Sequence, residues 1–132
     1  MRVTISLLLL ITACAFADVS ASAAELLMYR RAGCPWCAAW DRDIGPAYGK
    51  TEFGRRAPLR MVDVHGDRPA IALKGAIIYT PTFVLVENGR EVGRLEGYAG
   101  NHFFWELLAR LLEQLPAGAA SDLSAAPTRA SP

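Results

Sequence analysis

Two cysteines separated by two residues, Cys34 and Cys37, are the side chains of this sequence with the most definite chemistry. Pro35 and Trp36 lie between them. Cysteines at this spacing on a helix can close a disulfide within one turn, and Pro35 suits the first turn of a helix, where a missing N–H costs little. The pair therefore predicts thiol–disulfide exchange with another molecule.

The two sulfurs are expected to differ in reactivity. Cys34 would lie at the helix N-terminus, where unpaired backbone N–H groups and the positive end of the helix dipole favour a thiolate. Cys37 shares a helical face with Trp40 and Ile44, so it should be more buried. We expect an accessible Cys34 to attack a substrate disulfide and Cys37 to resolve the mixed disulfide.

A cysteine pair has three other uses in proteins. A structural zinc site needs four ligands, and the sequence adds only His65 and His102, each of which is expected to be a surface or capping residue. A static disulfide across so small a loop would stabilise the fold little. A non-enzymatic Cu(I)-binding module stays open as an alternative. We expect no metal and no cofactor.

A second feature is Pro81, which comes directly before an apolar stretch at 82–86 that is typical of a central strand covered on both faces. Proline cannot donate to a strand ladder, but it is allowed at a strand start, and a cis peptide bond is a common reason for its presence there. Thr80 precedes it. This placement predicts a second functional element besides the cysteines.

The hydrophobic pattern supplies the elements that would position these motifs. Strands are expected at 26–29, 59–64, 82–86 and 91–95, with a tight hairpin turn at Asn88-Gly89. A helix should begin at the cysteine pair, break at Gly45-Pro46 and continue over 47–53, followed by a loop at 54–58 and a short helix at 70–75. The last helix carries one apolar stripe, formed by Phe104, Leu107, Leu108, Leu111, Leu112 and Leu115. These elements predict an α/β sandwich with helices on both faces of one sheet.

Length and composition fit a single folded domain. The chain has 132 residues, of which 52% are hydrophobic and 20% charged, so it is not a disordered chain. Its formal net charge of +1 argues against a nucleic-acid partner. We expect a monomer.

The N-terminal stretch 1–24 has the three-part pattern of a secretory signal peptide: Arg2, an apolar run and then small residues. The apolar run is shorter than a membrane-spanning helix needs. A lesser possibility is that Cys14, in Ile11-Thr12-Ala13-Cys14, is a lipidated cysteine. Export to the periplasm is expected, where disulfides persist. Residues 25–115 would form the domain, and 116–132, rich in Ala, Ser and Pro, a disordered tail.

The order of these features resembles the thioredoxin superfamily over residues 25–115. The resemblance implies a thioredoxin-like sandwich with a mixed four-stranded sheet. It also implies that Pro81 is cis and faces the cysteine pair, and that the backbone of Thr80 pairs with the substrate chain. From their position between the cysteines, Pro35 and Trp36 are candidate substrate-binding residues. Pro35 would stiffen the turn, and Trp36 would either form a partly exposed apolar surface that docks a polypeptide or pack against the loop.

A narrower resemblance is to the small periplasmic thioredoxins of bacterial sulfur-oxidation systems, the SoxS type, in the phrases at 33–37, 45–48, 54–59 and 75–82. It implies a reductant that acts on a cysteine or disulfide of a partner protein, a sulfur-oxidation carrier protein in that family, and that is recharged by a membrane-bound electron donor. An oxidase or isomerase that forms disulfides is the alternative. Typical thioredoxins carry a buried carboxylate where this chain has Met28, so the base that serves Cys37 is unassigned.

Overall fold

The computed structural model describes residues 24–116. The predicted signal peptide with Cys14, and the predicted tail, lie outside the described residues apart from Ala24 and Pro116. In chain order the elements are β1 (Glu25–Arg30), α1 (Pro35–Asp43), α2 (Gly45–Tyr48), α3 (Glu52–Arg56), β2 (Leu59–Asp63), β3 (Thr82–Glu87), β4 (Arg90–Glu96) and α4 (Asn101–Leu112). None of the described helices is both long and apolar enough to cross a bilayer.

The strands form one mixed sheet in the order β2-β1-β3-β4. Strand β1 pairs parallel with β2 and antiparallel with β3, and β3 pairs antiparallel with β4. The two central strands are buried along nearly their whole length, which explains their continuous apolar sequences. Asn88 and Gly89 have φ angles of 52° and 71°, the conformation of the predicted tight hairpin turn. The mixed four-stranded sheet and this hairpin are confirmed.

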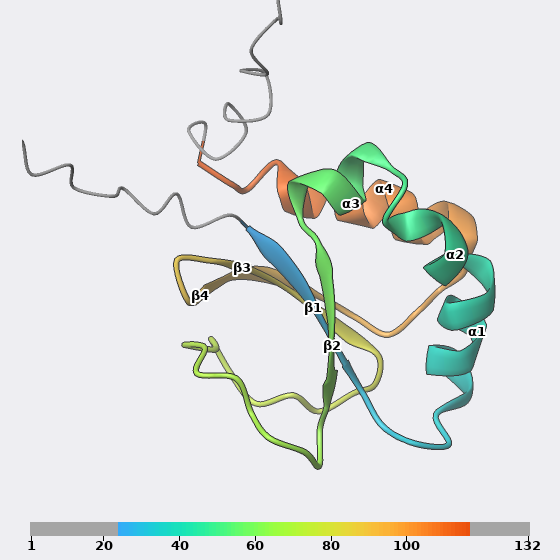
Figure 1. Ribbon diagram of the computed structural model, residues 1–132, viewed down its shortest axis with the longest axis horizontal. Helices are drawn as coiled ribbons and strands as arrows, with labels where there is room; N and C mark the ends of the chain where they lie inside the picture. Colours follow the sequence, from blue (N-terminus) through green and yellow to red (C-terminus); the bar gives the residue numbers. More distant parts are fainter. Residues whose placement is uncertain (1–23, 117–132) are drawn as a thin grey trace, which may run out of the picture.

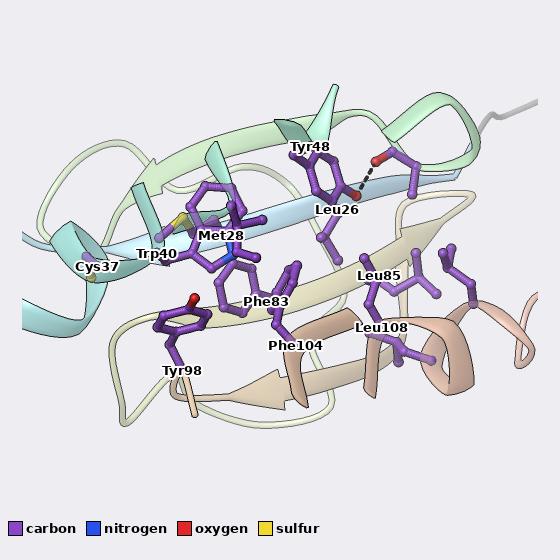
Figure 2. Close-up of a cluster of buried hydrophobic side chains, with 14 of the residues drawn as sticks. Leu26, Met28, Cys37, Trp40, Tyr48, Phe83, Leu85, Tyr98, Phe104 and Leu108 are labelled. Atoms are coloured by element: carbon purple, nitrogen blue, oxygen red, sulfur yellow. Dashed lines mark hydrogen bonds between the residues drawn. The ribbon is translucent and has the colours of Figure 1, made fainter. Parts of the chain in front are cut away.

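One face of the sheet is covered by helices, which Figure 1 shows gathered on a single side. Side chains of α1, α2 and α4 enter one buried cluster with Met28 and Phe83 of the sheet, and Phe53 of α3 packs against it. Trp40 lies at the centre of this cluster, with its ring 5.5 Å from Phe83 and 5.8 Å from Phe104 (Figure 2). Of the stripe predicted on the last helix, Leu107 is exposed.

The other face of the sheet is covered by irregular chain. Val64, Ile71, Leu73 and Ile77 pack there against the second buried cluster. The helix expected at 70–75 is wrong, and so is the placement of helices on both faces. The physical reason lies in the backbone hydrogen bonds: Ala72 N–H donates to Gly89 O, and Glu91 N–H donates to Ala72 O, so Ala72 bonds to the β3–β4 hairpin and not to its own turn.

The same irregular segment is hydrogen-bonded to an ion pair within β4, formed by Glu91 and Arg94. The buried carboxylate of Glu91 accepts a hydrogen bond from Arg94 Nε at 2.7 Å and another from the backbone N–H of Lys74. Arg94 also donates to the carbonyl oxygens of Gly75 and Ala76, both at 3.0 Å. Hydrogen bonds from Arg94 hold the pKa of Glu91 below its usual value. These contacts fix the course of the chain that leads to Thr80.

The break at Gly45-Pro46 is confirmed, since α1 ends at Asp43 and α2 begins at Gly45. The continuous helix expected over 47–53 and the loop at 54–58 are wrong, because α3 spans Glu52–Arg56. Its start is set by Thr51, whose hydroxyl accepts a hydrogen bond from Gly54 N–H at 3.1 Å. This N-cap is the sequence signal that predicts a new helix after Tyr48.

Candidate active site

The end of β1 delivers the cysteine pair to the edge of the sheet. The chain leaves β1 at Arg30, turns through Gly33 in a left-handed conformation (φ 71°) and enters α1. Cys34 is the N-cap of that helix and Pro35 lies in its first turn, as predicted. The N–H of Cys37 points at Cys34 Sγ, at 3.2 Å. The backbone therefore offers a hydrogen bond to the sulfur that would carry negative charge after reduction.

Cys34 and Cys37 are joined by a disulfide, with their Cα atoms 5.3 Å apart. Cys37 is 1% exposed and Cys34 is 5% exposed. Cys37 is thus the more sheltered of the two, but the expectation of an accessible Cys34 is wrong in the disulfide form. Its sulfur lies against the Thr80 side chain and backbone, within a surface hollow of about 680 Å³ that Arg31 and Met61 also line.

Thr80 and Pro81 face this disulfide across the edge of the sheet, although 46 residues separate Thr80 from Cys34. The Thr80–Pro81 peptide bond is cis. Cys34 Sγ lies 3.4 Å from the carbonyl oxygen of Thr80. The sheet explains the meeting: Tyr29 of β1 pairs with Thr82 of β3, so the end of one strand adjoins the start of the other.

The Thr80 hydroxyl adds a side-chain contact to the sulfur. It donates toward Cys34 Sγ at 3.4 Å and accepts a hydrogen bond from Arg31 Nε at 3.3 Å. Because the guanidinium occupies a lone pair of the hydroxyl oxygen, the hydroxyl proton is directed at the sulfur. Sequence reasoning missed Arg31. Its only sequence signal is its position directly after β1, three residues before Cys34.

Exposed apolar side chains adjoin the disulfide. Trp36 is 62% exposed, so it is not packed against the loop, and Tyr79 is 60% exposed. Both line a hollow of about 480 Å³, together with Thr80 and the loop from Gly97 to Ala99. Pro35 is also exposed, whereas Pro81 is buried at the start of β3. Apolar surface beside a reactive bond suits the docking of a polypeptide.

Among the described residues the one buried carboxylate is that of Glu91, which is bonded to Arg94 and to the Lys74 N–H and is not part of the cluster around Cys37. Met28 is fully buried at the position where typical thioredoxins carry their acid. Tyr98 is one of the polar side chains of this cluster, and its hydroxyl donates to Asp43 Oδ2 at 3.0 Å. Burial and this carboxylate raise the pKa of Tyr98 to about 12, so it holds its proton at neutral pH.

The two histidines are not brought to the cysteine pair. His102 lies on α4 beside Glu106, and His65 follows β2 in an exposed turn. Over residues 24–116, no group of three or more His, Cys, Asp or Glu side chains is placed to hold a metal ion.

A disulfide at a helix N-terminus, facing a cis-proline loop on a mixed four-stranded sheet, defines a thiol-disulfide oxidoreductase. Two solved structures support this class. The periplasmic thioredoxin SoxS from Paracoccus pantotrophus is 44% identical, covers 69% of this chain and 97% of its own, and superposes with a TM-score of 0.67. The thioredoxin of Fasciola hepatica is 25% identical over 67% of this chain and 81% of its own, with a TM-score of 0.52.

This chain therefore belongs to the thioredoxin superfamily, and it is similar to SoxS in particular. No protein-family profile and no curated protein sequence matches it.

Proposed function

We propose that this protein is a periplasmic reductant of protein cysteines, with Cys34 as nucleophile and Cys37 as resolving residue. The observation that carries the proposal is the position of Cys34 Sγ: it lies at the start of α1, within hydrogen-bond reach of a backbone N–H, and 3.4 Å from the carbonyl oxygen before Pro81. A target sulfur that approaches Cys34 would therefore lie beside Thr80.

The reaction transfers two electrons to the substrate disulfide. The thiolate of reduced Cys34 attacks one substrate sulfur, the substrate S–S bond breaks, and the leaving thiolate takes a proton from solvent. Cys37 then loses its proton and attacks Cys34 Sγ. The mixed disulfide breaks, the second substrate thiol is released, and the Cys34–Cys37 disulfide forms. Because no carboxylate lies in the described part of the core around Cys37, we propose that the proton of Cys37 passes to the departing substrate thiolate or to water.

Substrate binding is assigned to the surface around the disulfide. Trp36 and Pro35 would pack against side chains of the partner polypeptide, and the backbone of Thr80 would pair with its extended chain. Pro81 holds that backbone beside Cys34 without offering an N–H of its own.

Two observations support the proposed periplasmic location and the proposed kind of partner protein. The pattern at 1–24 is that of an export signal, and the similar SoxS of P. pantotrophus is a periplasmic thioredoxin. We propose that the target is a cysteine or disulfide of a partner protein, such as a sulfur-oxidation carrier protein, and that a membrane-bound donor restores the reduced pair. Whether the protein reduces or oxidises its target depends on the redox potential of the Cys34–Cys37 pair, and a measurement of that potential tests the proposed direction.

The decisive experiment is trapping with Cys37→Ser, which would leave the mixed disulfide on Cys34 unresolved. The variant should capture a periplasmic protein in a complex that dithiothreitol releases, and Cys34→Ser should capture none. Equilibration with glutathione gives the direction: a reductant should have a potential near that of thioredoxin, about −270 mV, and an oxidant one near −120 mV. Equal capture by both serine variants would contradict the assigned roles.

A further inference from the structure

A cavity lies on the face of the sheet where Val64, Ile71, Leu73 and Ile77 pack, directly behind the Thr80 loop. Its volume is about 720 Å³, and its walls are the end of β1, the turn after β2 and the irregular segment before β3. Tyr29, Ile71 and Leu73 form part of its apolar lining.

The cavity adjoins the hollow that contains Cys34. Arg31 and Asp63 line both spaces. Thr80 lines the cavity as well, and its hydroxyl contacts Cys34 Sγ. A polypeptide that presents its sulfur to Cys34 can therefore place a neighbouring side chain in this cavity without leaving the surface of the protein.

Positively charged side chains outnumber negatively charged ones in the lining of the cavity. Arg31 uses Nε for Thr80, and neither Arg31 nor Arg68 forms an ion pair within the described part of the chain. His65 also lines the cavity. Asp63 is the acidic residue of the lining, and one of its oxygens accepts a hydrogen bond from the backbone N–H of His65 at 2.8 Å.

The neighbouring Arg30 shows the contrast, because its guanidinium is paired with Asp41 through two hydrogen bonds of 2.8 and 2.7 Å. Two guanidinium groups beside one carboxylate leave a positive surface next to the reacting sulfur. Such a surface attracts a carboxylate, and arginine offers it a fork of parallel donors.

We propose that this cavity binds an acidic side chain of the substrate polypeptide, a glutamate or aspartate close in sequence to the reacting cysteine. Arg31 and Arg68 would hold the carboxylate, and the apolar wall would take the stem of the side chain. The inference rests on the proposed function, since it names the class of substrate for the same disulfide. Arg31 is a specificity-determining residue in this view, and it also positions the Thr80 hydroxyl.

The test uses two synthetic peptides that differ only in charge. Each contains one cysteine as a mixed disulfide with 2-mercaptoethanol, flanked on both sides by glutamate in the first peptide and by glutamine in the second. The second-order rate constant for reduction by the full, pre-reduced protein is measured in a single turnover. The readout is the ratio of the two rate constants, which cancels any effect of a substitution on Cys34 itself.

We expect the wild-type protein to favour the acidic peptide by about tenfold at low salt, and this preference should shrink toward one at high salt. Arg68→Gln should lower the ratio by about threefold, and the double variant Arg31→Gln/Arg68→Gln should abolish the preference. Arg110→Gln is the matched control, because it removes the same charge from α4, outside the cavity, and should leave the ratio unchanged.

A ratio near one for the wild type, or a ratio that Arg68→Gln leaves unchanged, would overturn the inference. Hydroxyethyl disulfide, a neutral substrate without a polypeptide, separates this failure from a failure of the proposed function. If the protein reduces this small disulfide but does not distinguish the peptides, only the acidic-substrate inference is wrong. If it reduces none of the three, the proposed reductase function is wrong as well.

Discussion

The hydroxyl of Thr80 lies 3.4 Å from Cys34 Sγ and is oriented by Arg31 on its other side. In the disulfide form this contact is weak, because the sulfur carries no charge. After reduction the same hydroxyl would donate to a thiolate, and hydrogen bonds to charged groups are roughly twice as strong as neutral ones. The contact therefore stabilises the reduced protein more than the oxidised one.

Thr80→Val should remove this hydrogen bond while keeping the branched shape of the side chain. We expect the Cys34 thiolate to form less readily and the equilibrium constant with glutathione to shift about threefold to tenfold toward the disulfide. The thiolate absorbance as a function of pH and the glutathione equilibrium measure the two effects. Thr80→Ser keeps the hydroxyl and should behave like the wild type; if Ser and Val variants shift equally, the hydroxyl has no such role.

Trp36→Ala should impair the reduction of protein substrates and spare that of small ones. Trp36 is exposed beside the disulfide, so its removal takes away docking surface without disturbing the core. We expect a rise in KM of about tenfold for a disulfide-bonded protein such as insulin, with kcat nearly unchanged, since the loss of one large interface side chain costs about 1–2 kcal/mol. An equal loss with hydroxyethyl disulfide would show that Trp36 acts on the cysteines directly.

The Glu91–Arg94 ion pair predicts acid sensitivity. The pKa of Glu91 is lowered in the folded protein, mainly by the hydrogen bond from Arg94, so the pair stabilises the fold above the ordinary carboxyl pKa. This contribution should be lost as the pH falls below about 4.5 and through the lowered value. Glu91→Gln should cost about 1–3 kcal/mol at pH 7, because the side chain is 1% exposed.

Denaturant unfolding at a series of pH values measures this loss. The difference between Glu91→Gln and the wild type should narrow at low pH, where the wild-type carboxylate is protonated. Glu113→Gln, on the exposed end of the chain after α4, serves as the control with no change at either pH. A difference that is constant with pH would show that the charge of Glu91 is irrelevant to stability.

The close packing of α3 against α2 predicts a contrast between two glycines. A Cβ on Gly54 would overlap the carbonyl oxygen of Tyr48, which is backbone and cannot move aside freely. Gly54→Ala should therefore destabilise the fold by about 2 kcal/mol or more, as overpacking does elsewhere. Gly49→Ala has open space around its Cβ and should be neutral or stabilising. Thermal unfolding of the two variants tests this contrast, and equal melting temperatures would contradict the prediction.

Sequence alone predicted the parts of this protein that local chemistry determines. The central strands were predicted because their apolar runs are buried on both faces, and the position of Cys34 at a helix start because Pro35 begins a helix well. The conformation of Pro81 was implied by the thioredoxin resemblance, since proline at a strand start by itself allows either isomer.

The parts that failed depend on contacts between distant segments. The chain at 70–75 contains residues that allow a helix, but its hydrogen-bond partners are on the β3–β4 hairpin. Arg31 contacts Thr80, 49 residues away, and nothing near Arg31 in the sequence indicates that meeting. Cys34 is buried for the same reason. The chain at Thr80 lies against its sulfur only because β1 and β3 pair.

The charges on the two border strands have a consequence for how the molecule behaves in a crowded solution. Arg60 and Asp63 lie on β2, while Arg90, Arg94 and Glu96 lie on β4, and the chain at Ala72 already bonds to the outer side of β4. A strand from a second copy could pair with either edge of the sheet only if these charged side chains lost their hydration, which is unfavourable. We therefore expect that concentrated samples do not form fibrils and that copies of the protein do not associate through the edges of the sheet.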